Sequence, residues 1–305
     1  MSISGFDYPV PLPDGVREKN ARMIALSAKW LNQDLAFPEE LLAVKEREGL
    51  SSKEAYAALL ALEARLDTEG RDRDFTLDYV IPSLREYRLS DFTADPYFKT
   101  VGFAGGGCGD WRLDTLVLPP YALFPAGDLT VRRDGRLLPR LGFFREPFLY
   151  PAVLENGREW MTLLPIEQVT MREPIRRAHG RVLTLGLGLG YFAFHAAEKE
   201  EVESVTVVER SPDVIRLFKE AILPRFPNGE KIRIVRDDAF LFAEEHATPD
   251  AFDFVFSDIW HDAGDGREAY LRLLRIFRER GEMDLAFWLE DTILCYLDGE
   301  LWPRR

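Results

Sequence analysis

Glycines and carboxylates follow directly on three strand-like apolar runs of the sequence. "RVLTL" leads into Gly186, Gly188 and Gly190, "SVTVV" leads into Glu209, and "FDFVFS" leads into Asp258. Glycine permits positive φ and a close approach of ligand to backbone, and a carboxylate accepts hydrogen bonds from ligand hydroxyl or amino groups. We expect a small polar ligand at these positions. The alternatives are a tight strand-to-helix turn for the glycines and a solvated strand-end acid for Glu209.

A fourth run, "KIRIVR", leads into Asp237-Asp238-Ala239. A carboxylate at Asp238 can accept a hydrogen bond from the amino group of a flat heterocycle, and the small Ala239 leaves room for the ring. Asp238 can also cap the helix expected after it, and the two roles are compatible.

The segment after Asp258 contains Trp260, His261 and Asp262. Two carboxylates and an imidazole can bind a protonated amine and take up its proton, so Asp258, His261 and Asp262 are the candidate catalytic residues. Trp260 is a candidate substrate-binding residue because its ring face attracts a cation. The alternative is an acidic surface loop around a buried tryptophan.

The candidate residues fall where expected strands end. From residue 179 onward, apolar β-branched runs alternate with runs of helical spacing, which predicts a parallel sheet with helices on both faces. In such a sheet the carboxyl ends of the strands meet at one edge, where ligands bind. The predicted strands are 181–186, 203–209, 231–235, 252–258 and 284–289, and the predicted helices are 190–200, 212–224, 239–247 and 266–280.

Two other regions precede this α/β region. Residues 1–95 have helical spacing, with Ser51 and Glu54 forming a capping box, and predict a helical N-terminal domain or cap. Residues 96–165 are rich in strand formers, with Asp134-Gly135 and Asn156-Gly157 as hairpin turns, and predict a small β-rich module. The third predicted domain is a Rossmann-like domain over 166–305.

Composition narrows the classes of partner. The 305 residues carry a formal net charge of −13, which disfavours nucleic-acid backbones and anionic lipid. Two cysteines and four scattered histidines predict neither a disulfide framework nor a metal site. The N-terminus lacks the pattern of a signal peptide and no apolar run is long enough for a membrane span, so we expect a cytoplasmic protein with a small-molecule substrate. A homo-oligomer is compatible with the sequence.

Four pieces occur in the order and spacing of a known family: "VLTLGLGLGYFA", "VTVVERSPDVI", "IRIVRDDAF" and "FDFVFSDIW". Through them, residues of about 165–289 resemble the class I S-adenosylmethionine-dependent methyltransferase superfamily, and within it the spermidine-synthase-like branch. The resemblance implies S-adenosylmethionine as cofactor. It also implies that Gly186, Gly188 and Gly190 face the methionine part, Glu209 the ribose and Asp238 the adenine, while Asp258 lies beside the sulfonium.

The resemblance extends to "LLPIEQVTM", which looks like the lead-in that closes over the cofactor, so Glu167 and Thr170 are further cofactor-binding candidates. Two features depart from the family. Thr184 stands where the family usually has an acid, and too little chain follows residue 289 for the family's C-terminal antiparallel hairpin. We therefore expect a doubly wound, mostly parallel sheet whose last strands are missing.

The resemblance favours a methyltransferase acting on a small amine-bearing or otherwise cationic acceptor. Aminopropyl transfer from decarboxylated S-adenosylmethionine is one alternative, although the acid of the glycine loop and the D-x-x-D-P motif of polyamine synthases are lacking. A nicotinamide dinucleotide is a rival cofactor, because Gly188, Gly190 and Ala193 fit a G-x-G-x-x-A spacing. A non-catalytic protein that binds S-adenosylmethionine or a nucleotide is the third alternative.

Overall fold

The computed structural model describes residues 15–102 and 105–301, which form two compact units. Unit 1 contains residues 15–92 and 117–148 of those described, and unit 2 contains 93–102, 105–116 and 149–301. The stretch 96–165, expected as one β-rich module, is divided between the units because its central part packs with the N-terminal helices. No helix in the described ranges has both the length and the apolarity to cross a bilayer.

Unit 1 combines helices with short strands. The predicted capping box is present, since the Ser51 side chain accepts from the Glu54 backbone N–H and the Glu54 side chain accepts from that of Ser51. Its core includes Tyr56 stacked on Phe143, with ring centroids 4.3 Å apart. The helices are α1 (Val16–Leu31), α2 (Pro38–Glu48), α3 (Ser52–Glu63), α4 (Arg73–Phe75), the π-helix η1 (Thr76–Val80), α5 (Ile81–Ser83) and, at the boundary, α6 (Ser90–Thr93).

The strands of unit 1 are β1 (Leu84–Glu86), β4 (Phe124–Pro125), β5 (Thr130–Val131), β6 (Leu137–Leu138) and β7 (Leu141–Phe143). They form a sheet of order β1-β7-β4 and a hairpin of β5 and β6. Asp134-Gly135 lies between the two strands of that hairpin, as the dipeptide predicts.

Unit 2 begins with α7 (Pro96–Val101) and a sheet of order β2-β3-β8-β9, in which the pairs β2–β3 and β8–β9 are antiparallel. Asn156 and Gly157 make the tight turn between β8 and β9 with φ of 50° and 78°, as predicted for a hairpin dipeptide. The strands are β2 (Gly106–Cys108), β3 (Trp111–Leu118), β8 (Phe148–Glu155) and β9 (Arg158–Thr162).

The rest of unit 2 is built on a five-stranded sheet of order β12-β11-β10-β13-β14 in which every pair is parallel. The predicted strands and helices are confirmed, with ends that differ by a few residues. The elements are α8 (Pro165–Arg177), β10 (Gly180–Leu185), α9 (Tyr191–Ala197), β11 (Val202–Glu209), α10 (Pro212–Ala221), η2 (Leu223–Arg225), η3 (Gly229–Lys231), β12 (Ile232–Arg236), α11 (Ala239–His246), β13 (Phe254–Ser257), α12 (Gly266–Arg280), β14 (Asp284–Phe287) and α13 (Glu290–Leu301).

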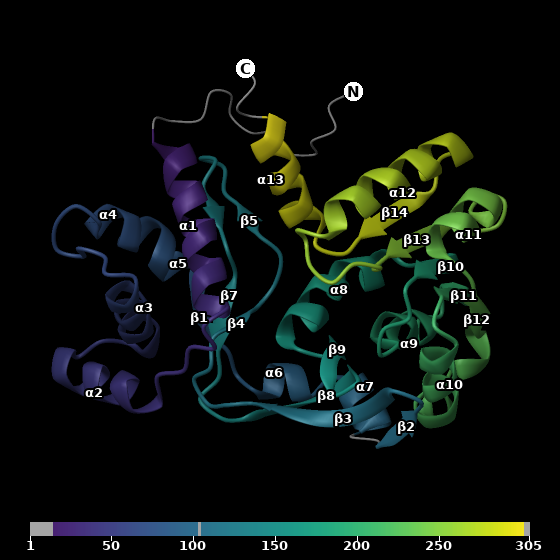
Figure 1. Cartoon of the computed structure of the whole chain (residues 1–305), viewed down its shortest axis with the longest axis horizontal. Helices are drawn as coiled ribbons and strands as arrows, with labels where there is room; N and C mark the ends of the chain where they lie inside the picture. The colour runs from purple at the N-terminus through teal and green to yellow at the C-terminus, as the bar shows by residue number, and fades with distance from the viewer. Residues whose placement is uncertain (1–14, 103–104, 302–305) are drawn as a thin grey trace. The chain divides into compact units, whose positions relative to one another are not determined.

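The strand order makes this sheet doubly wound. The crossovers through α9 and α10 run from β10 toward β12, whereas the crossover through α12 runs the opposite way from β13 to β14. Right-handed crossovers in opposite directions place their helices on opposite faces, as Figure 1 shows for α9 and α12. The reversal between β10 and β13 is the switch point at which such sheets bind ligands.

The described part of the chain ends in a helix after the last strand of this sheet. After β14 the chain forms α13, and no further strand of the sheet follows within residues 290–301. The fold of this part of unit 2 is therefore a Rossmann-like, doubly wound α/β sheet.

Candidate functional site

The glycine turn, residues 186–190, connects β10 to α9 at the switch point of the sheet. Gly186 has φ +97°, and a Cβ there would lie 2.0 Å from the carbonyl oxygen of Asp258. Gly190 has φ +74°, and its Cβ would lie 2.3 Å from the ring of Phe218. Both glycines are thus required by packing within the protein. Gly188 (φ +59°) differs, because a Cβ there would meet the flexible side chain of Met161, 3.1 Å from its Sδ.

Thr184, in the position where the resembling family usually has an acid, lies in the middle of the buried sheet. Its side chain is buried and its hydroxyl donates to the carbonyl oxygen of Gly186 at 3.4 Å. Thr184 therefore contributes a hydrogen bond to the turn and no charge.

Glu209 and Asp238 lie at the ends of neighbouring strands, joined by a backbone hydrogen bond from Asp237 N to Glu209 O. One carboxylate oxygen of Glu209 accepts from Ser211 N at 2.8 Å. One oxygen of Asp238 caps α11, accepting from the backbone N–H groups of residues 240 and 241 at 2.9 and 3.1 Å. Among the described residues the second oxygen of each has no hydrogen-bond partner, so each carboxylate retains acceptor capacity. Ala239, the half-buried first residue of α11, follows directly.

Glu167 and Asp258 form a pair of carboxyl groups beside the turn. Glu167 lies in the first turn of α8, and Asp258 follows β13, where its backbone N–H donates to the carbonyl oxygen of Leu185. Burial, and then the charge of Asp258, hold the pKa of Glu167 well above its usual range. Burial raises the pKa of Asp258 to about 7. Both shifts favour the protonated carboxyl, because burial weakens the solvation of the charged form and the charge of Asp258 opposes the ionisation of Glu167.

Two buried polar atoms flank this pair in the sequence. The Nε2 atom of Gln168 and the Oγ atom of Ser257 are buried and have no hydrogen-bond partner among the described residues. Gln168 is next to Glu167, and Ser257 is next to Asp258. Buried polar groups are normally satisfied, so these two atoms are exceptions within the described part of the chain.

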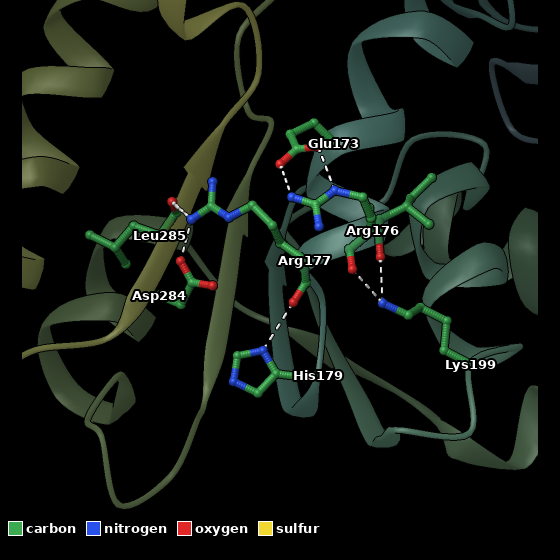
Figure 2. A network of polar contacts seen from close by, with 8 residues as sticks. Glu173, Arg176, Arg177, His179, Lys199, Asp284 and Leu285 are labelled. Atoms are coloured by element: carbon green, nitrogen blue, oxygen red, sulfur yellow. Dashed lines mark hydrogen bonds and ion pairs between the residues drawn. The ribbon is translucent and has the colours of Figure 1, made fainter. Parts of the chain in front are cut away.

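The far end of α8 is fixed to the sheet, as Figure 2 shows. Lys199 donates to the carbonyl oxygens of Ile175, Arg176 and Ala178, which caps the helix C-terminus. Arg177 pairs with Asp284 of β14 and donates to the carbonyl oxygen of residue 285 at 2.8 Å. These contacts hold the helix that carries Glu167.

Thr170, the second cofactor-binding candidate of α8, already has structural partners. Its hydroxyl donates to the carbonyl oxygen of Ile166 at 2.6 Å and accepts from the indole N–H of Trp288 at 2.9 Å. It joins α8 to the residue after β14.

The loop after Asp258 does not bring all its candidates to the carboxyl pair. His261 and Asp262 are exposed, and the Asp262 carboxylate accepts from the N–H groups of Gly264 and Asp265 within the loop. Trp260 is buried, with its ring against Gly266 and its indole N–H donating to the carbonyl oxygen of residue 288. Of the three catalytic candidates, only Asp258 interacts electrostatically with Glu167. The sequence predicted a cofactor-binding role for Glu167.

A second polar network beside the turn was not predicted. Asp95, which precedes α7, binds the side chains of Tyr191 and His195 on α9. The i, i+4 spacing of Tyr191 and His195 was the only available signal, because Asp95 lies far away in the sequence.

As for metals, the described residues contain no group of three or more histidine, cysteine, aspartate or glutamate side chains that could hold an ion.

No family model and no curated protein matches the chain. Solved structures similar to it include a probable spermidine synthase from Corynebacterium glutamicum, 23% identical over 36% of this chain and 44% of that chain, with a TM-score of 0.31. Spermidine synthase from Thermotoga maritima is 15% identical over 60% of this chain and 54% of that chain, with a TM-score of 0.34. A putative methyltransferase from Escherichia coli is 14% identical over 40% and 66%, with a TM-score of 0.32.

The similarity thus spans less than half of the corynebacterial protein. The similar structures include spermidine synthases, methyltransferases and a precorrin decarboxylase. These matches are partial and concern the fold, whereas the chemistry of the site depends on this chain's own residues.

Proposed function

We propose that the chain is an S-adenosylmethionine-dependent methyltransferase that acts on a small amine-bearing or otherwise cationic acceptor. The observation that carries this proposal is the position of Asp258 at the switch point of the sheet, where its backbone lies against Gly186 of the glycine turn and its charge acts on the buried acid Glu167. A carboxylate there suits a cation and can take up one proton near neutral pH.

The residues present fit the cofactor. The acceptor capacity left on Glu209 suits the two hydroxyls of a ribose, and that on Asp238, beside Ala239, suits an adenine amino group. When bound, the cofactor supplies an electrophilic methyl group that is transferred by direct displacement. The chain positions the acceptor in line, and the Asp258 carboxyl holds the proton that the acceptor nitrogen gives up.

Aminopropyl transfer remains a second candidate because of the same pair. Two carboxyl groups beside the glycine turn would repel the carboxylate of S-adenosylmethionine, which its decarboxylated form lacks. Their raised pKa values favour protonation, which reduces this repulsion, so methyl transfer stays first.

Calorimetric titration with S-adenosylmethionine, decarboxylated S-adenosylmethionine and NADH tests the proposal. Glu209→Ala should weaken S-adenosylmethionine binding by at least about 100-fold, since it removes a bidentate charged acceptor. Glu203→Ala is the matched control, because Glu203 is an exposed glutamate on the same strand. Preference for the decarboxylated form would favour aminopropyl transfer, and preference for NADH would favour the dinucleotide. No binding by any of the three would refute the proposal.

A further inference from the structure

Asp95 and Tyr97, from a distant part of the sequence, form hydrogen bonds to the glycine turn and to the helix that follows it. Tyr97 lies on α7, 92 residues before Leu189, and its hydroxyl donates to the Leu189 carbonyl oxygen at 2.6 Å. Leu189 stands between Gly188 and Gly190. The contact therefore fixes the turn at its most freely rotating part.

Tyr97 is completely buried, so this hydrogen bond is shielded from water. The ring packs edge-to-face against Tyr191, Phe194 and Phe226, with centroids 5.4, 5.4 and 6.1 Å away. Burial, together with the charge of Asp95, raises the pKa of Tyr97 far above its usual range. The hydroxyl consequently stays a donor at every physiological pH.

Asp95 joins α7 to the first two turns of α9, which Figure 1 shows next to each other. Its Oδ1 atom accepts from Tyr97 N at 2.8 Å and from His195 Nε2 at 3.0 Å, and its Oδ2 atom accepts from the Tyr191 hydroxyl at 2.8 Å. Burial opposes its ionisation, but His195 and the other donors together lower the pKa of Asp95 below its usual range. The carboxylate is therefore ionised at neutral pH and holds three donors at once.

A glycine-rich turn has many accessible conformations, and a ligand that must order it binds more weakly. Inside the turn, the only backbone bond that the structure gives between described residues 186–190 is from Gly190 N to Leu187 O. Its shape must then be fixed by contacts from outside. Tyr97 supplies one to the Leu189 carbonyl, and Asp95 supplies another by fixing the start of α9.

We propose that Asp95 and Tyr97 are positioning residues that hold the glycine turn in its ligand-binding conformation before the ligand arrives. We call these two residues, Asp95 and Tyr97, the clamp. They act on ligand binding through the turn, and neither residue needs to touch the ligand. Only the identity of that ligand rests on the proposed function. Removal of the clamp should loosen the turn and weaken ligand binding to a similar extent.

Tyr97→Phe tests the clamp with the ring retained. Amide hydrogen exchange in residues 186–190 should become about tenfold faster, because a buried carbonyl loses its donor. Affinity for S-adenosylmethionine should fall by about the same factor. Tyr56→Phe is the matched control, since Tyr56 is also fully buried and its hydroxyl donates to a backbone carbonyl, that of Tyr121, at 2.8 Å within unit 1. The control should lower the melting temperature comparably while leaving exchange in the turn and affinity unchanged.

Asp95→Asn and Asp95→Ala separate positioning from general packing. Asparagine keeps one acceptor oxygen, so it should preserve part of the protection and affinity that alanine loses. The proposal is overturned if Tyr97→Phe leaves exchange in the turn as slow as in Tyr56→Phe, or if it speeds exchange without weakening binding. Exchange is measured without ligand, so if wild-type protein binds none of the three cofactors, the proposed function fails while exchange still decides whether the clamp exists.

Discussion

Strand β13 has an aspartate immediately before it and another immediately after it, and the two are in opposite electrostatic states. Asp253 accepts from Arg181 through both carboxylate oxygens, and this partner lowers its pKa to about 2. Asp258 has no such cationic partner among the described residues; its charge acts on another acid, Glu167, and burial raises the pKa of Asp258 to about 7. At the amino edge of the sheet, charged side chains therefore stabilise the fold. Arg177 and Lys199 are further examples, as Figure 2 shows. At the carboxyl edge, the acids Glu167 and Asp258 are poorly satisfied instead. An unsatisfied group in a well-satisfied protein is where a ligand is expected.

Exchanging each aspartate for asparagine should affect activity in one case and stability in the other. Asp258→Asn should lower turnover by at least about 100-fold, because it removes the proton acceptor. Turnover is measured as S-adenosylhomocysteine formation with a panel of small amines, and calorimetry should show most of the cofactor affinity retained. Asp253→Asn is the control and should leave turnover unchanged. If Asp258→Asn retained wild-type turnover, Asp258 would not be the acceptor of the proton.

Lys199→Met tests the amino edge alone. The substitution keeps the apolar stem but leaves the carbonyl oxygens of Ile175, Arg176 and Ala178 without their donor. We expect the free energy of unfolding, measured with urea, to fall by about 2 kcal/mol. Cofactor affinity should fall by less than about twofold. A large loss of affinity would mean that the two edges are not independent.

The acids at the two edges should change the stability of the fold in opposite directions as the pH rises. Glu167 and Asp258 have raised pKa values, so the folded state binds more protons than the unfolded chain between about pH 4 and 7, and stability falls as pH rises through this window. We expect Glu167→Gln to raise the free energy of unfolding at about pH 8 by on the order of 1 kcal/mol and to flatten this part of the curve. A variant less stable than wild type at that pH would contradict the carboxyl pair.

Asp253 should behave in the opposite way, with the smallest effect. Its pKa is lowered, so its pairing with Arg181 stabilises the fold above the unfolded pKa of about 4 and is lost as pH falls toward 2. Because the two side chains are 34% and 37% exposed, Asp253→Asn should remove no more than about 1 kcal/mol at neutral pH. The difference from wild type should shrink in urea unfolding below about pH 3.

The sequence predicted the sheet of unit 2 well because apolar periodicity and strand-end turns are local signals. It singled out Asp258 by its place at the end of a strand, but it could not identify the partners of Asp253 and Asp258, because Arg181 and Glu167 lie far away in the sequence. His261 was assigned to the reactive centre because it is adjacent to Asp258, but hydrogen bonds within the loop keep it exposed.

The clamp was beyond prediction for the same reason. Asp95 caps the short helix α7 and Tyr97 lies on it, the helix has no chemical signature, and the roles of both residues arise only when α7 packs beside α9. The sequence predicted that the glycines of residues 186–190 serve a ligand. Packing within the protein explains two of them, since Gly186 and Gly190 have no room for a side chain.

The most direct test of the difference between the two edges is a pH titration of the carboxyl carbons by NMR, with ¹³C-labelled aspartate and with Asp258→Asn and Asp253→Asn used for assignment. We expect one aspartate signal that titrates near pH 7 and disappears in Asp258→Asn. We also expect that the signal lost in Asp253→Asn shifts only near pH 2. If no aspartate titrated above about pH 5, Asp258 would be an ordinary surface acid, and the carboxyl edge would hold no aspartate with a raised pKa.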